Sequence, residues 1–188
     1  MTTHQPDVYV TSTGHRFTRS SSGAPRWIGT VVLTGADGKP LADPSQTMSR
    51  LQPWMADPTG IRTRALAALD VLRVQKEVDP ARLAAIGYCF GGTTALEIAR
   101  SGADVKAVVG FHSGLATARP QDAVNIKAKV LVCIGADDPI IPPEQRLAFE
   151  KEMKSAPIDW RLQLYGGAGH SFTNPAAVDG DECRIEPD

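Results

Sequence analysis

The sequence lacks the features that mark a membrane, secreted or nucleic-acid-binding protein. Its longest apolar runs fall far short of the ~18 residues that a membrane-spanning helix needs. The N-terminus has no basic start followed by an apolar core, so it does not predict a secretory signal. A net charge of −1 over 188 residues provides no basic surface for nucleic acid or an anionic membrane. We therefore expect neither kind of partner.

Cysteine is scarce, and the three that are present, Cys89, Cys133 and Cys183, are widely scattered. They are too few for a disulfide framework and form no Cys-x-x-Cys site. A reducing cytoplasm is the expected location, where a lone cysteine in a special context is a candidate nucleophile. Cys133 lies in an apolar run and is expected in the core, and Cys183 is expected to be incidental.

The length fits a single domain, residues 1–188, with a core of its own. From residue 61 onward, helix-like segments (61–78, 91–102, 142–156) alternate with strand-like segments (83–88, 105–112, 127–136, 159–167). Continuous apolar strands between helices predict βαβ units and a mostly parallel sheet flanked by helices. The pattern indicates the α/β class.

The two ends of the chain do not follow this alternation. Residues 1–36 are predicted to be an atypical arm, either a weak hairpin or disordered, in which 27–33 is the strongest strand candidate. Residues 36–60 are rich in Pro, Gly and Asp and are predicted to be a loop. Residues 176–188 are predicted to be a frayed tail.

The segment Gly87-Tyr88-Cys89-Phe90-Gly91 fits the pattern G-x-S-x-G, with cysteine in place of serine. This pattern makes a tight turn from a strand into a helix and exposes its central residue. Both glycines are expected because side chains there would collide across the bend. The turn predicts Cys89 as a nucleophile and the Phe90 N–H as a donor to a developing oxyanion. A buried structural cysteine is the alternative that the segment alone leaves open.

Candidate partners for Cys89 follow the later strands. Asp137 and Asp138 come just after the third predicted strand, and His170 lies in a glycine-rich loop after the fourth. This is the nucleophile–acid–histidine order of the α/β-hydrolase fold, with each residue at the carboxyl end of a strand. The histidine would take up the thiol proton, and an aspartate would orient the histidine. By this reasoning either aspartate fits.

Three ordered motifs resemble those of the dienelactone hydrolase family. GYCFGG, GADDPIIP and GAGHSF stand where the family has G-x-C-x-G-G, G-x-x-D-x-x-[V/I]-P and G-x-G-H-x-F. The resemblance covers roughly residues 37–175 and selects Asp138, four residues before Pro142. It implies an α/β-hydrolase-like fold and a Cys89–Asp138–His170 triad. It also implies hydrolysis of small esters or lactones through an acyl-thioester, with no metal or cofactor.

The chain departs from the family's pattern near its N-terminus. The family's H-E-x-x-G loop, which supplies a second oxyanion donor, has no counterpart here, so we expect a truncated or replaced N-terminal segment. Residues 83–88 would then lack a strand partner on one side. An unpaired strand edge is costly and invites association. We therefore expect either a homo-oligomer or marginal stability, unless residues 27–33 fill the gap.

Substrate contacts are less well defined by the sequence. Tyr88, His112 and Trp54 are candidate substrate-binding residues, with ordinary packing as the alternative for each. Asn174 stands where the best-studied family members carry a carboxylate-binding arginine, so dienelactone itself is not the expected substrate.

Two other functions remain as alternatives. One is a catalytically impaired remnant of the fold that serves as a binding or assembly module, and it is motivated by the absent oxyanion loop. The other is a thiol-redox protein, which is the weakest because no resolving cysteine lies near Cys89 in the sequence.

Overall fold

The computed structural model describes residues 9–10, 15–19, 27–31, 51–76 and 78–174. The predictions for the tail at 176–188, for Cys183 and for most of the first 50 residues lie outside the described residues. Among the described helices, none is long and apolar enough to cross a membrane.

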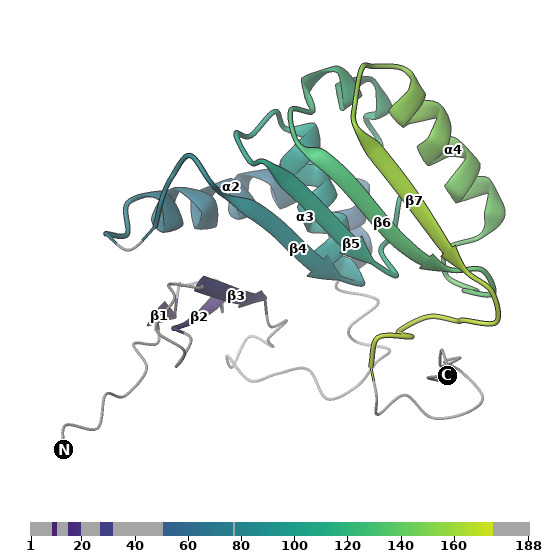
Figure 1. The fold of residues 1–188 in the computed structure, drawn as a ribbon, viewed down its shortest axis with the longest axis horizontal. Helices are drawn as coiled ribbons and strands as arrows, with labels where there is room; N and C mark the ends of the chain where they lie inside the picture. Colours follow the sequence, from purple (N-terminus) through teal and green to yellow (C-terminus); the bar gives the residue numbers. More distant parts are fainter. Residues whose placement is uncertain (1–8, 11–14, 20–26, 32–50, 77, 175–188) are drawn as a thin grey trace.

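A parallel sheet of four strands forms the centre of the molecule (Figure 1). The strands follow one another in space as they do along the chain: β4 (Ala84–Tyr88), β5 (Ala107–Phe111), β6 (Lys129–Gly135) and β7 (Trp160–Tyr165). α2 (Pro58–Arg73) precedes β4, and the crossovers contain α3 (Phe90–Arg100), the 3₁₀ helix η1 (Pro120–Asn125) and α4 (Pro143–Lys154). The predicted α/β fold, with a parallel sheet flanked by helices, is confirmed.

The N-terminal strands form a separate antiparallel sheet. β1 (Tyr9–Val10) pairs with β2 (His15–Arg19), which pairs in turn with β3 (Trp27–Val31). The predicted strand at residues 27–33 is thus a strand over 27–31, and it pairs with β2 rather than with β4.

The loop predicted over residues 36–60 is wrong at its C-terminal end, because residues 51–56 are helical. The Pro53 carbonyl accepts the Asp57 N–H at the end of this segment, a helical i to i+4 hydrogen bond of 3.2 Å. Leu51 is buried. The side chain of Asp57 then accepts the Thr59 N–H and caps α2, so α2 follows almost without a break.

The helices pack on one face of the sheet. Leu69 of α2, Leu96 of α3 and Phe149 of α4 join Val108 and Val130 of the sheet in one buried core. Side chains alternate between the two faces along a strand. The other face carries Ile86, Tyr88, Val109, Phe111 and Leu131, none of which is fully buried by the described residues.

A network of buried charges fastens the helices to one another. Arg100 of α3 is fully buried, donates two hydrogen bonds of 2.7 Å to Glu152 of α4, and donates another of 2.8 Å to Glu97. Arg62 of α2 pairs with Glu97 and with Asp122 of η1. The side chain of Arg62 is only 12% exposed, and these two carboxylates compensate its charge. Removing one member would leave a buried charge unpaired, which is strongly destabilising.

The outer edge of β4 has no strand partner among the described residues, since β4 pairs only with β5 there. Ile86 and Tyr88 on this strand are 66% and 54% exposed. Parallel strands are ordinarily covered on both faces, and open apolar edges favour association. We therefore predict that the protein self-associates through β4.

Ile86→Lys tests this prediction, because a charge on the edge strand opposes pairing with a second copy. We expect light scattering to show a wild-type mass above that of the monomer, and a shift toward the monomer in the variant. Leu147→Lys on α4 is the matched control, since Leu147 is 64% exposed and lies away from the edge. A monomeric wild-type protein at every concentration would contradict the prediction.

Candidate active site

Cys89 lies at a strained turn between β4 and α3. Its backbone has φ 50° and ψ −123°, a conformation that non-glycine residues rarely adopt. A Cβ on Gly87 would come within 2.1 Å of the Gly91 carbonyl, and one on Gly92 within 1.7 Å of the Ser113 hydroxyl. The turn therefore requires Gly87 and Gly92, and it leaves Cys89 exposed.

The expectation that Gly91 is also required is wrong. A Cβ built on Gly91, at the start of α3, meets no atom of the described residues within 4 Å. The pattern G-x-C-x-G-G thus contains one glycine that the described neighbours do not enforce.

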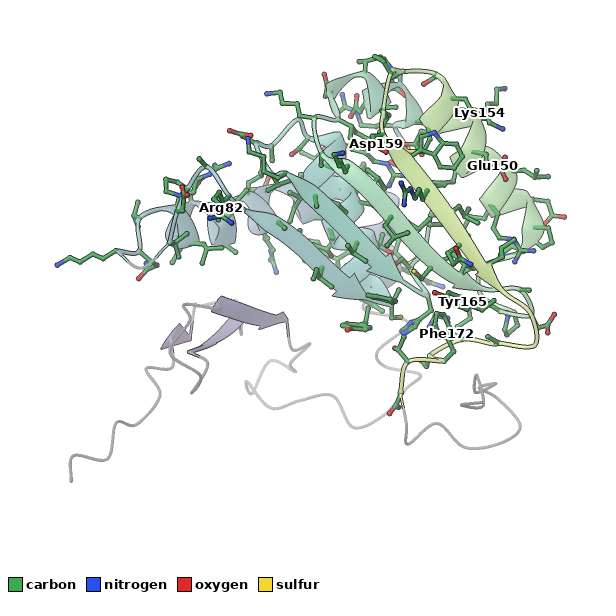
Figure 2. All side chains as sticks on the ribbon, viewed as in Figure 1. Arg82, Glu150, Lys154, Asp159, Tyr165 and Phe172 are labelled. Atoms are coloured by element: carbon green, nitrogen blue, oxygen red, sulfur yellow. The ribbon has the colours of Figure 1, made fainter. Side chains whose placement is uncertain are left out.

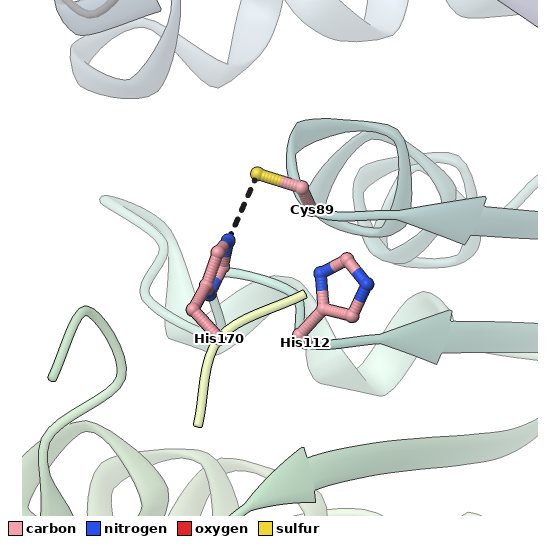
Figure 3. A group of neighbouring side chains, drawn as sticks. All are labelled: Cys89, His112 and His170. Atoms are coloured by element: carbon pink, nitrogen blue, oxygen red, sulfur yellow. Dashed lines mark hydrogen bonds between the residues drawn. The ribbon is translucent and has the colours of Figure 1, made fainter. Parts of the chain in front are cut away.

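His170 connects Cys89 to Asp138. Its Nδ1 lies 2.9 Å from Asp138 Oδ2. Its Nε2 lies 3.4 Å from Cys89 Sγ, the contact that Figure 3 marks with a dashed line. An ionised carboxylate can only accept hydrogen bonds, so Nδ1–H donates to it and Nε2 faces the sulfur. Of the two candidate acids, Asp138 is buried and makes this contact, whereas Asp137 is exposed.

Asp138 is held from its other side by backbone. The N–H groups of Ile140 and Ile141 donate to its Oδ1 over 2.8 and 3.3 Å. Burial alone would raise the pKa of this carboxyl, but the hydrogen bonds from His170 and from these two N–H groups lower it overall. Asp138 is therefore ionised at neutral pH and orients the imidazole.

The sulfur and the imidazole favour the charged forms of each other. The pKa of the Cys89 thiol falls from 9.0 to about 6, chiefly through the His112 ring and then through His170, with a smaller contribution from the Phe90 N–H. Burial lowers the pKa of His170, but hydrogen bonds with Asp138 and Cys89 outweigh it and raise that pKa to about 9. Between these values the resting pair is a thiolate and an imidazolium.

His112 is closer to the chemistry than the sequence indicated. It follows β5 with φ 38°, is buried, and its ring centroid lies 4.9 Å from that of His170 in an edge-to-face contact. Its Nε2 lies 2.9 Å from Thr173 Oγ1, a partner that sequence reasoning missed. The only signal for Thr173 was its place three residues after His170 in the same loop.

The other predicted site residues occupy different surroundings. The ring of Tyr88 stacks on Phe111 with centroids 5.1 Å apart, and its centroid lies 6.0 Å from that of His112. Trp54 instead packs against Arg64 of α2, with 4.0 Å between its ring centroid and the guanidinium carbon. Two further aromatic residues, Tyr165 and Phe172, pack together at the carboxyl end of β7 (Figure 2). Substrate binding by Tyr88, His112 and Trp54 stays a prediction.

The described residues include one group that could hold a metal ion. One ligand atom each from Cys89, His112 and His170 lie within 4.8 Å of one another.

Comparison with known proteins gives a consistent result. The model described as "Dienelactone hydrolase family" matches residues 6–185, a longer span than the three motifs indicated. A solved structure described as m3DLH is 44% identical with a TM-score of 0.79, over 87% of this chain and 69% of that one. A dienelactone hydrolase-like promiscuous phosphotriesterase from metagenomic libraries is 41% identical with a TM-score of 0.70, over 78% of this chain and 62% of that one.

Curated sequences give a similar result over shorter lengths. A Bradyrhizobium sp protein named "Probable 2-oxo-3-(5-oxofuran-2-ylidene)propanoate lactonase" is 33% identical over 130 residues. The match covers 57% of this chain and 52% of that protein, so this chain spans about half of that relative's length.

Alanine substitutions at Gly87 and at Gly91 test which glycine the turn requires. Gly87→Ala should lower the free energy of unfolding by about 1–3 kcal/mol, because its Cβ overlaps a backbone carbonyl. Gly91→Ala should leave it unchanged or raise it by up to about 1 kcal/mol, because alanine favours a helix. Denaturant unfolding of both variants measures the difference, and equal losses would contradict the account of the turn.

Proposed function

The chain belongs to the dienelactone hydrolase family, and we propose that it hydrolyses small carboxylic esters or lactones through an acyl intermediate on Cys89. The observation that carries the proposal is the position of His170, which is 3.4 Å from the Cys89 sulfur and 2.9 Å from the Asp138 carboxylate. A histidine between a thiol and a buried carboxylate is the arrangement that nucleophilic acyl transfer needs.

In the acylation step, the Cys89 thiolate attacks the carbonyl carbon of the ester and a C–S bond forms. The carbonyl oxygen becomes an oxyanion, which the Phe90 N–H stabilises from the start of α3. The intermediate then collapses as the C–O bond to the leaving group breaks. The leaving oxygen takes the proton from Nε2 of His170, and an acyl-thioester and an alcohol result.

In the deacylation step, the now neutral His170 removes a proton from a water molecule, which attacks the thioester carbonyl. The C–S bond breaks, the acid is released, and Cys89 leaves as a thiolate beside the imidazolium. Asp138 stays ionised through both steps and holds the Nδ1–H tautomer. Each residue thereby returns to its resting state.

The substrate class follows from what surrounds the sulfur. Cys89 is exposed beside His112, whose ring contacts those of Tyr88 and Phe172, and this aromatic neighbourhood suits a small, largely apolar acyl group. The lactonase activity in the name of the Bradyrhizobium relative supports lactones as one substrate type. The triad described above also favours an enzyme over the alternative of a binding or assembly module.

Variants of Cys89 and of the two neighbouring aspartates test the proposed roles. Cys89→Ala should lower kcat/KM for a short-chain ester by at least about 10³-fold, and Asp138→Asn should lower kcat by about 10⁴-fold by favouring the wrong tautomer. The matched control is Asp137→Asn at the exposed neighbouring position, with an expected change within about twofold. Mass spectrometry of the quenched wild-type enzyme should detect the acyl group on Cys89. Unchanged turnover in Cys89→Ala would refute the proposal.

The pH profile provides a separate test. For an alkyl ester, kcat/KM should fall below pH about 6 as Cys89 gains a proton, and above pH about 9 as His170 loses the proton that the leaving group needs. An aryl ester should show a weaker alkaline fall because its leaving group needs less proton assistance. His112→Asn should move the acidic limb toward higher pH. A rate that rises steadily through pH 9 with both substrates would indicate an ordinary thiol and contradict the ion pair.

A further inference from the structure

A second imidazole, that of His112, lies beside the reactive sulfur and lowers the pKa of the thiol, but the proposed reaction passes no proton through either of its ring nitrogens. Nδ1 of His112 is buried and has no hydrogen-bond partner among the described residues, and the residue is only 4% exposed. Thr173 holds the other ring nitrogen, and Figure 3 shows Nδ1 on the side of the ring toward Cys89 and His170. A buried polar atom without a partner costs free energy. This geometry indicates that Nδ1 has a ligand when the site is occupied.

We propose that Cys89, His112 and His170 bind a divalent transition-metal ion of the zinc type, and that this binding reversibly blocks hydrolysis. The inhibitory part rests on the proposed function, whereas the binding itself does not.

The spacing of the ligand atoms fits a tetrahedral ion. With Zn–S of about 2.3 Å and Zn–N of about 2.0 Å, a sulfur and a nitrogen on one zinc ion lie about 3.5 Å apart. Cys89 Sγ and His170 Nε2 are 3.4 Å apart, and all three ligand atoms lie within 4.8 Å of one another. Because Cys89 is exposed, rotation of its side chain can shorten the longer separations.

The outer partners of both histidines also fit a metal site. A metal-binding histidine usually anchors its second nitrogen on a carboxylate or another polar group. His170 uses Nδ1 for Asp138, and His112 uses Nε2 for Thr173. A thiolate and two imidazoles favour zinc, cobalt or copper over magnesium or calcium, which prefer oxygen ligands. The charges of Cys89 and Asp138 balance that of the ion.

Binding would exchange a proton for the metal without any redox change. The resting imidazolium of His170 releases its Nε2 proton to solvent, and one bond forms from the metal to each of Sγ, Nε2 and Nδ1. The sulfur lone pair is then unavailable to attack a carbonyl carbon, and Nε2 can no longer transfer a proton. Hydrolysis should stop while the metal is bound and return when a chelator removes it.

Cobalt(II) is the probe for the binding step. Addition of Co²⁺ to the metal-free wild-type protein should produce the intense visible bands of tetrahedral cobalt and a thiolate-to-cobalt charge-transfer band, and Zn²⁺ should abolish both. Calorimetry of Zn²⁺ binding in buffers of different ionisation enthalpy should detect the release of about one proton. Cys89→Ser should lose the charge-transfer band.

His112→Asn separates this site from a simple cysteine–histidine pair. It should weaken Co²⁺ binding by at least about tenfold, and Asp70→Asn, the control at an exposed carboxylate on α2, should leave binding unchanged. If His112→Asn does not fold, Thr173→Val removes the hydroxyl that fixes the ring and should also weaken binding by about tenfold. Absence of the charge-transfer band in the wild type, or unchanged affinity in the folded variant, would overturn the proposal.

Hydrolysis measured in the same samples distinguishes the two proposals. Ester turnover with chelator present and no cobalt spectrum would overturn the metal site alone. A cobalt spectrum without any turnover would leave the metal site standing and refute the proposed hydrolase function. Turnover that Zn²⁺ does not reduce, in a protein that binds it, would overturn the inhibitory role.

Discussion

The hydrogen bond between Nδ1 of His170 and the Asp138 carboxylate is the constraint on which the candidate site depends. It fixes the tautomer of the imidazole, and through that tautomer it directs Nε2 to the Cys89 sulfur at 3.4 Å. The three residues come from loops after β7, β6 and β4, so they meet only because parallel strands all end at the same edge of the sheet. Two backbone N–H groups fix the carboxylate in turn. The backbone thus holds Asp138, Asp138 orients His170, and His170 directs Nε2 to the Cys89 sulfur.

The same site also depends on the position of α3. The first residue of this helix is Phe90, and its N–H helps to lower the pKa of the Cys89 thiol. Buried charges hold the helix. Arg100 is tied to Glu152 of α4, and Glu97 is tied to Arg62 of α2. Such pairs gain little net stability over apolar packing, but breaking one is costly. We infer that these ion pairs keep α3 in place against its neighbouring helices, while the turn that precedes α3 holds Cys89 in a strained conformation.

The sequence was informative where a local pattern determines the structure. Apolar runs predicted β4 to β7, and the three motifs predicted which residues the loops would bring together. The sequence was less informative where contacts between distant segments determine the position of a side chain. Arg62 is buried because Glu97 and Asp122 approach it from other elements, and nothing next to it in the sequence indicates this. His112 faces the sulfur because β5 ends beside β4, so its position depends on strand order. Gly91 resembled a required glycine because it belongs to the motif, yet of the motif's three glycines the described residues pack tightly only around Gly87 and Gly92.

Cys89 and His170 rest as a thiolate and an imidazolium between the two pKa values. The most direct measurement is the ultraviolet absorbance of the thiolate as a function of pH in chelator-treated protein, recorded as the difference between the wild type and Cys89→Ser. The account predicts a titration with an apparent pKa of about 6. A titration near the ordinary thiol value of 9.0 would contradict it.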